Sequence, residues 1–204
     1  MSAFLGPIHY WLYNKISLQQ AIVDKLYTLG KEYSLTLEDD CNNLYGTFAN
    51  KPLEEMIDHG NIHGWLQDRV SQVEYKYAYS VTKLIAKSPE ALKEIKNILF
   101  EAGKEIGSSI DNNTASMADI YKLITDNLLD GMPCDHANSV IEQKDQEIIW
   151  KRNICVHKNY WDEVSGDINI YYALRDAWLE GFVAASSLTY NRLDPITYSI
   201  SKGE

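Results

Sequence analysis

Residues 140–155 read VIEQKDQEIIWKRNIC, two short apolar runs around a polar centre. In the second run, Ile148 and Trp150 alternate with neighbours that face the opposite side, which is typical of a β-strand. The pattern predicts two strands and a connecting turn, over Val140–Glu142, Glu147–Cys155 and residues 143–146. We therefore expect an antiparallel hairpin in the last third of the chain.

The sequence before this hairpin predicts helices. Apolar residues recur at helical spacing from residue 8, and Gly30 is a typical helix stop. Pro52 suits the first turn of a second helix, and Ser88-Pro89 suits the cap of a third. The acidic and amide residues at 38–43 favour a loop or a helix cap. The expected helices cover residues 8–29, residues 53–87, a segment carrying Leu92, Ile95, Leu99 and Ala102, and, after a break at 111–113, residues from Thr114 to near Gly131.

A last helix and a last strand are expected after the hairpin, over residues 168–185 and 188–200. The fold class is then α+β and predominantly helical. An N-terminal helix bundle, residues 1–130, packs on a small C-terminal antiparallel sheet with its helix, residues 131–204. A chain of 204 residues favours one compact unit.

Composition narrows the class of protein. Asp and Glu outnumber Lys and Arg, 29 against 19, and the net charge of −10 argues against binding to nucleic acid or to an anionic membrane. No apolar run is long enough for a transmembrane helix, and the N-terminus lacks the basic segment of a signal peptide. Three cysteines fit a reducing compartment. We expect a cytoplasmic protein whose partner is a small-molecule ligand or substrate.

The segment His59-Gly-Asn-Ile-His63 is the first candidate site. Histidines four residues apart on a helix share a face and can chelate one metal ion. Glu55, one turn before, and Glu74, three turns after, fall near that face, and His9 can reach it from the neighbouring helix. Iron or zinc is the ion that such ligands favour.

Two other interpretations of this segment stay open. Gly60 and Gly64 are costly inside a helix, so they point to a close helix crossing or to a cofactor lying against the backbone. They are equally compatible with a loop, in which His59 and His63 share no face at all.

A Cys-x-His unit occurs at each end of the expected hairpin. Cys134 and His136 form the first unit, and Cys155 and His157 form the second. Residues two apart in a strand face the same side, so a two-stranded ribbon would offer two thiolates and two imidazoles to one zinc or iron ion. The alternative is that Cys155 is a small buried residue and both histidines lie on the surface.

The C-terminal third resembles a known enzyme family. The residues that carry the likeness are IWKRNICVHKNYW at 149–161, then Asp176-Ala-Trp-Leu-Glu-Gly181-Phe and a final strand from Leu188. This order is similar to the L-2-amino-thiazoline-4-carboxylic acid hydrolase-like family, and Cys155, Asp176 and Gly181 carry over by position. The resemblance implies a reaction that opens a small thiazoline ring with a cysteine at its centre. His157 or His136 would then lower the pKa of Cys155 or act as the base.

Aromatic residues are abundant in the helices that carry the N-terminal histidines. They are Tyr10, Trp11, Tyr13, Trp65, Tyr75, Tyr77 and Tyr79. A stripe of this kind is typical of a core, and less often it holds a flat cofactor such as haem. The leading prediction is a metal-binding protein that acts on a small molecule. The alternatives are a cysteine-dependent thiazoline-carboxylate hydrolase and a non-enzymatic haem or tetrapyrrole sensor or carrier.

Overall fold

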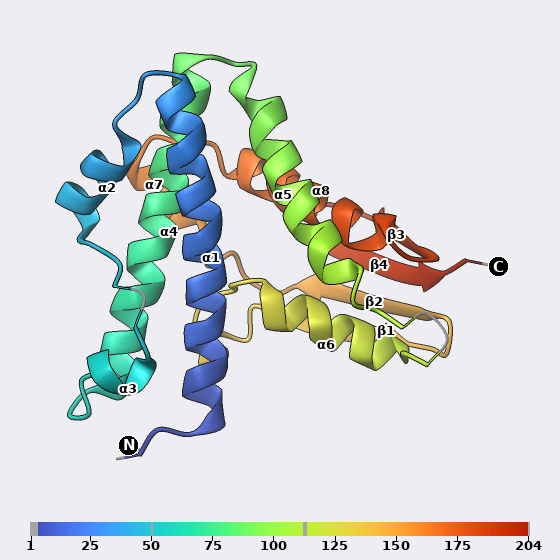
Figure 1. Cartoon of the computed structure of the whole chain (residues 1–204). Helices are drawn as coiled ribbons and strands as arrows, with labels where there is room; N and C mark the ends of the chain where they lie inside the picture. The colour runs from blue at the N-terminus through green and yellow to red at the C-terminus, as the bar shows by residue number, and fades with distance from the viewer. Residues whose placement is uncertain (1–3, 50, 112–113, 204) are drawn as a thin grey trace.

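The computed structural model describes residues 4–49, 51–111 and 114–203. Within them the fold is α+β and predominantly helical, with a small antiparallel sheet formed by the C-terminal part, which confirms the predicted fold class (Figure 1). None of the helices in this part of the chain combines the length and the hydrophobicity that a membrane span requires.

Two long helices, α1 (Pro7–Glu32) and α4 (Ile62–Lys87), run side by side in the N-terminal part (Figure 1). The predicted stop at Gly30 is wrong, because α1 continues to Glu32. Gly30 instead gives room to Leu37, whose Cδ1 would lie 2.6 Å from a Cβ at this position.

The predicted single helix over residues 53–87 is also wrong. A short helix α3 (Leu53–Met56) precedes a turn at residues 57–61, and α4 begins only at Ile62. The turn is held by local side chains, since Asp58 accepts the Gly60 N–H and Asn61 caps α4 by accepting the Gly64 N–H. Residues 38–43, expected as a loop or a cap, lie in helix α2 (Leu37–Tyr45).

Helix α5 (Ala91–Gly107) follows Pro89 as predicted and crosses α8 (Ile168–Ala184). The predicted cap is wrong, because Glu90 is the N-cap of α5 and Ser88 ends α4. Helix α6 (Met117–Asn127) begins later than predicted, because Ser116 rather than Thr114 forms its capping box, with Asp119. The expected break at residues 111–113 falls between α5 and α6, and residues 112 and 113 lie outside the described part. The remaining short elements are η1 (Pro133–Asp135), a 3-10 turn, and α7 (Lys158–Glu163).

The sheet has the strand order β1-β2-β4-β3, antiparallel throughout. The hairpin predicted from sequence is present as β1 (Asn138–Gln143) and β2 (Glu147–Arg152), although β2 ends three residues before Cys155. The single strand expected over 188–200 is two strands, β3 (Leu188–Arg192) and β4 (Thr197–Lys202). The turn between them is fixed by Asp194, whose carboxylate accepts the Ile196 and Thr197 N–H groups.

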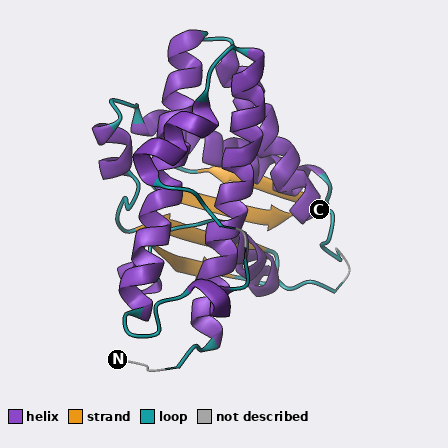
Figure 2. Ribbon diagram, turned by 60° about the vertical axis from the view of Figure 1, so that its left-hand side comes forward, coloured by secondary structure: helices purple, strands orange, loops and turns teal. Residues whose placement is uncertain are grey.

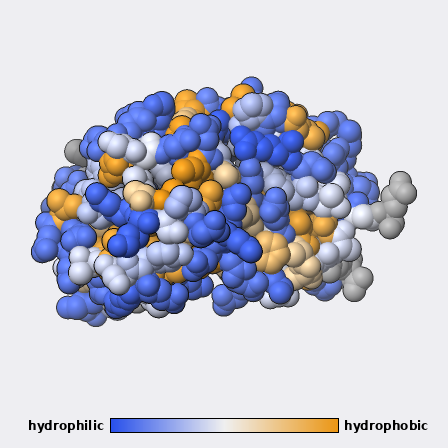
Figure 3. Space-filling view, turned by 90° about the horizontal axis from the view of Figure 1, so that it is seen from above, coloured by the Kyte–Doolittle hydropathy of each residue, from blue (hydrophilic) through white to orange (hydrophobic). Residues whose placement is uncertain are grey.

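Helices cover one face of this sheet (Figure 2). Ile148 and Trp150 of β2 and Ile200 of β4 join the same buried cluster as residues of α1, α4, α5, α6 and α8. The helical region and the α+β region therefore share this cluster, and a second buried cluster lies between α1, α3 and α4. Seen from above, the surface is dominated by hydrophilic residues with hydrophobic ones scattered among them (Figure 3).

Candidate functional site

A histidine is buried where the helices meet the C-terminal region. His157 sits at the start of α7 and is 2 % exposed. Its Nδ1 lies 3.1 Å from Oε2 of Glu74 on α4, and its Nε2 lies 2.8 Å from the hydroxyl of Tyr171 on α8. The Tyr171 ring also stacks on the imidazole, with centroids 4.0 Å apart. Three distant segments thus converge on this ring.

Asp130 and Arg175 extend the arrangement. The guanidinium of Arg175 donates two hydrogen bonds to the Asp130 carboxylate, at 2.8 and 2.9 Å. Asp130 Oδ1 also lies 3.5 Å from His157 Nε2. We call this group the buried ion cluster, and its members are Glu74, Asp130, His157, Tyr171 and Arg175.

Opposite charges hold the cluster in its ionised form. Burial alone would lower the pKa of His157, but the carboxylates of Glu74 and Asp130 raise it to about 9. Burial alone would raise the pKa of Asp130, but Arg175 and His157 hold it well below its usual range. The cluster therefore carries two negative and two positive charges near neutral pH, which balance.

A cavity of about 260 Å3 adjoins the cluster. We call it the Lys15 cavity. Its walls come from α1, from α6 and from the segment that leads through η1 into β1, and Asp130 lies in both the cavity wall and the cluster. The side chains that give the cavity its chemistry are Trp11, Lys15, Tyr121, Thr125, Asp130 and His136.

Lys15 is the unusual residue of this cavity, because it is 4 % exposed and its charge has no partner. Among the residues that the structure describes, none accepts a hydrogen bond from Nζ or pairs with it. The contact that it makes is with the Trp11 ring, whose centroid lies 4.1 Å from Nζ. Burial lowers the pKa of Lys15 to about 8, against the attraction of Asp130.

Neighbouring carboxylates are already matched by other groups. Asp130 is taken by Arg175, and Asp126 accepts from Lys122 and from the Trp11 indole N–H. The ammonium of Lys15 therefore adds a positive charge without a close partner, among the described residues, to a cavity that is partly open to solvent. An anionic group inside the cavity would remove that imbalance.

The metal site predicted around His59 and His63 is not built as expected. His59 lies in the turn before α4 and His63 in its first turn, so the two do not share a helix face, and both are exposed. Glu55 is exposed on α3, while Glu74 is buried against His157. The turn at Asp58 and Gly60 is the cause, since it breaks the helix that the prediction required.

His9 comes closer to the predicted arrangement. Its ring lies edge-on to that of His63, with centroids 5.7 Å apart, and both line a cavity of about 110 Å3 together with Cys134. His9 Nδ1 accepts the Gly6 N–H at 2.9 Å, so metal binding through Nε2 would move the proton and break this bond. Across residues 4–49, 51–111 and 114–203, no group of three or more His, Cys, Asp or Glu side chains is arranged for a metal ion.

The ribbon predicted to unite the two Cys-x-His units does not form. Cys134 lies in η1 and His136 adopts a left-handed backbone with φ 48°, both before β1. Cys155 and His157 follow the end of β2. His157 faces the buried ion cluster whereas the other three residues are exposed, so the four side chains do not point at one centre.

Cys155 and His157, which the sequence proposed as its base, have different hydrogen-bond partners. The Cys155 thiol accepts a hydrogen bond from Tyr172 at 3.0 Å, and Arg152 lies over the Tyr172 ring. The His157 ring is held by Glu74 and Tyr171 and is not the hydrogen-bond partner of this thiol. The arrangement therefore does not supply His157 as the base for Cys155.

Asp176 and Gly181 have packing roles on α8. Asp176 accepts hydrogen bonds from Tyr190 and Arg192 of β3, at 2.8 and 2.7 Å, and so ties the helix to the sheet. Gly181 allows α5 to approach, because a Cβ there would lie 1.9 Å from the Phe100 carbonyl oxygen.

The aromatic stripe is largely packing. Tyr13 and Tyr77 are buried, and Tyr75 stacks on Tyr45, with ring centroids 5.2 Å apart. Trp11 is the exception, since it lines the Lys15 cavity.

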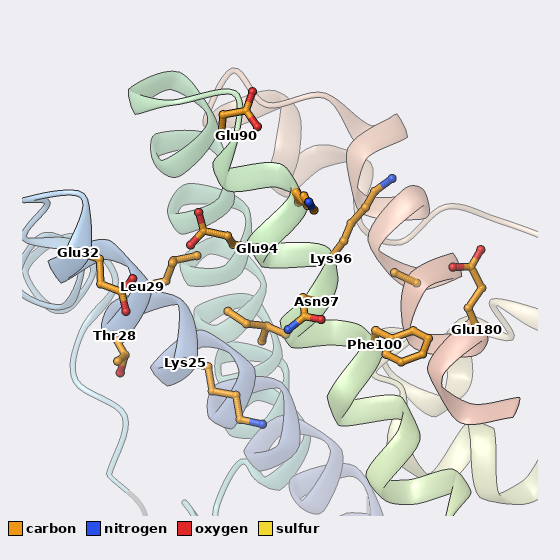
Figure 4. Close-up of a pocket in the computed structure, with 13 residues that line it drawn as sticks. Lys25, Thr28, Leu29, Glu32, Glu90, Glu94, Lys96, Asn97, Phe100 and Glu180 are labelled. Carbon is orange, nitrogen blue, oxygen red and sulfur yellow. The ribbon is translucent and has the colours of Figure 1, made fainter. Parts of the chain in front are cut away.

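A larger groove of about 860 Å3 runs between α1, α5 and α8 (Figure 4). Its rim carries charges of both signs, with Lys25 and Glu32 on α1 and Glu94 on α5. These side chains are exposed and can be solvated by water. The Lys15 cavity is smaller, but it holds an unpaired buried charge, and we therefore consider it the better candidate site.

Sequence reasoning missed the residues that define this site, although a signal was present. Lys15 falls on the apolar face of the first helix, between Leu12 and Ile16. Arg175 likewise falls on the buried face of α8, one turn after Tyr171. Charged residues at core positions are rare, so each marks a place that needs an explanation.

The comparisons with known proteins add no further identification. No protein-family model matches this chain, and neither a curated protein nor a solved structure matches it.

Proposed function

We propose that this protein binds a small organic acid in the Lys15 cavity. The observation that carries the proposal is the buried ammonium of Lys15, which lines a cavity and has no partner among the described residues. An ion pair with a carboxylate would supply both the missing charge and the missing hydrogen-bond acceptors.

The cavity walls favour a flat ligand. Trp11 and Tyr121 offer aromatic faces, and Thr125 offers a hydroxyl from the same helix as Tyr121. A volume of about 260 Å3 limits the ligand to a few heavy atoms beyond the carboxylate. The thiazoline carboxylate suggested by the C-terminal resemblance belongs to this class of ligand.

The test is a binding assay with matched acids and amides. Pyruvate, lactate and benzoate should raise the melting temperature of the protein, and the uncharged amides should not. Lys15→Met should remove the response, whereas Lys122→Met, which changes an exposed lysine beside the cavity, should keep it. An equal response to acids and amides, or a response that survives in Lys15→Met, would contradict the proposal.

The second candidate function is metal binding, by a set of residues that differs from the one predicted from sequence. His63 and Cys134 line one small cavity with His9, and an imidazole with a thiolate is a donor set that zinc and iron accept. Binding would need the side chains to turn and His9 to release the Gly6 N–H.

Titration of the metal-free protein with zinc or iron(II) tests this candidate. One equivalent should bind to the starting protein, and the double variant His63→Ala, Cys134→Ser should lose it. His59→Ala is the matched control, because this exposed histidine lies outside the cavity. Unchanged metal binding by the double variant would contradict this candidate function.

A further inference from the structure

The Lys15 amine is unusually free to react. A lysine ammonium can donate three hydrogen bonds, yet Nζ of Lys15 makes none with the described residues and lies over the Trp11 ring. A desolvated lysine in a pocket is a group that proteins use as a nucleophile toward carbonyl compounds. The buried position thus fits a chemical role as well as a binding one.

Resting on the proposed function of the cavity, we propose that its ligand is a 2-oxo acid and that Lys15 forms an imine with the ligand's carbonyl carbon. In a 2-oxo acid the carbonyl carbon is bonded directly to the carboxylate carbon. A ligand whose carboxylate pairs with Nζ therefore presents the carbonyl to the same nitrogen.

The reaction balances without an added reagent. Nζ gives its electron pair to the carbonyl carbon, the C–O double bond opens, and the oxygen leaves as water with two hydrogens that come from the ammonium. The ammonium and the oxo acid thus become a protonated imine, which retains the carboxylate, and one water molecule. The net charge is zero before and after the step, so the cavity gains no new charge.

The surroundings of Lys15 support this step. Its pKa of about 8 leaves about a tenth of the amine neutral at pH 7, far more than for an ordinary lysine. Asp130 is held by Arg175 and does not compete as an ion-pair partner. The protonated imine keeps a positive charge where the ammonium was, beside the ligand's own carboxylate.

Reductive trapping of the full chain tests the proposal. Pyruvate with cyanoborohydride converts an imine into a stable amine, which intact-mass measurement and peptide mapping locate. We expect one adduct, on the peptide that carries Lys15, formed at least about tenfold faster than any on Lys122. The reason is that a pKa of about 8 makes the neutral fraction at pH 7 about three hundredfold larger than that of a lysine with the ordinary value of 10.5. Lys15→Arg should abolish this adduct, and Lys122→Arg should retain it.

Lactate separates the imine from simple binding, because it has the carboxylate but no carbonyl. Lactate should protect Lys15 from trapping in the unaltered protein, a result that needs no variant to fold. If lactate binds in a Lys15-dependent way and pyruvate is not trapped, the imine is refuted and the organic-acid site stands. If pyruvate labels exposed lysines as fast as Lys15, the imine is again refuted. If neither acid binds, both proposals fall.

Discussion

Lys15 imposes a cost on the folded chain. Its ammonium is largely removed from water and has no hydrogen-bond or ion-pair partner among the described residues, and such a group destabilises the folded state. Proteins retain such costs mainly where activity needs them. We therefore expect replacement of Lys15 to raise the stability of the protein and to remove its function.

Lys15→Met should stabilise the protein. The fall of the Lys15 pKa to about 8 corresponds to about 3 kcal/mol between the charged and neutral forms, and part of this should appear as added free energy of unfolding at pH 7. A lysine pKa lowered in the folded state penalises folding fully below about pH 8, and the penalty fades as pH rises toward 10.5. Urea denaturation at pH 7 and pH 10 measures both effects. Lys122→Met should change stability by less than about 0.5 kcal/mol.

His157 has the opposite dependence on pH. Its folded pKa of about 9 lies above the unfolded value of 6.5, so its stabilisation is complete below pH 6.5 and is lost as pH rises through 9. The advantage of the unaltered protein over His157→Gln should therefore shrink by about 3 kcal/mol between pH 6 and pH 9.5. Lys15 contributes equally to both proteins and cancels.

Cys155 remains the residue on which the hydrolase prediction depends. Turnover of 2-amino-thiazoline-4-carboxylate, measured as product released, should be abolished in Cys155→Ser because the nucleophile is lost. Cys134→Ser is the matched control, since Cys134 is also exposed and free. Turnover that is absent from the unaltered protein rules this activity out, and turnover that persists equally in both variants rules out Cys155 as its nucleophile.

The residue types in the sequence indicated which side chains carry reactive groups, but they did not show which of these groups contact one another. Glu74 and His157 both drew attention in the sequence, for a metal site and for a reactive cysteine, and the fold pairs them with each other. Their separation of 83 positions leaves no local pattern to detect. Pairing of this kind follows from how α4 and α7 pack, which periodicity does not specify.

The crossing of α5 and α8 depends on three glycines at the contact. A Cβ at Gly103, Gly107 or Gly181 would lie 1.9 Å from a backbone oxygen of the opposite helix. Gly181→Ala should therefore cost about 3 kcal/mol of unfolding free energy, because two backbones must separate. Gly6→Ala, where the nearest atom to a Cβ is 4.0 Å away, should change stability by less than about 0.5 kcal/mol. Equal losses in the two variants, measured by urea denaturation, would contradict the close-crossing explanation.

Helices and strands with a strong local pattern were predictable from the sequence, whereas the turns that interrupt such patterns were not. The hairpin of β1 and β2 follows from alternation, and the helix after Pro89 follows from its apolar spacing. The turn at residues 57–61 was missed because apolar spacing continues across it, although Asp58 and Asn61 supply its hydrogen bonds. The turn at Asp194 was missed in the same way, within a run rich in strand-forming residues.

At the scale of the molecule, the shared core predicts one unfolding transition. Residues of α1 and α4 lie in the same cluster as those of the sheet. The second buried cluster, between α1, α3 and α4, is built on the same two long helices, so we expect the two regions to unfold together. Far-ultraviolet circular dichroism reports the helices. In a Trp11→Phe, Trp65→Phe variant, fluorescence reports Trp150, Trp161 and Trp178, all of which lie in the C-terminal region. The two midpoints in urea should coincide, and a separation of the curves would show two independent domains.

The strand order has a consequence for synthesis on the ribosome. Strand β4 is the last to be made, yet it occupies the interior of the sheet between β2 and β3. Until residue 202 leaves the exit tunnel, β2 has an unpaired edge, and Ile148 and Trp150 lack their neighbours from β4. The nascent chain must therefore hold its apolar helices and a half-built sheet until β4 emerges, which makes it a natural client for chaperones that shield hydrophobic surface.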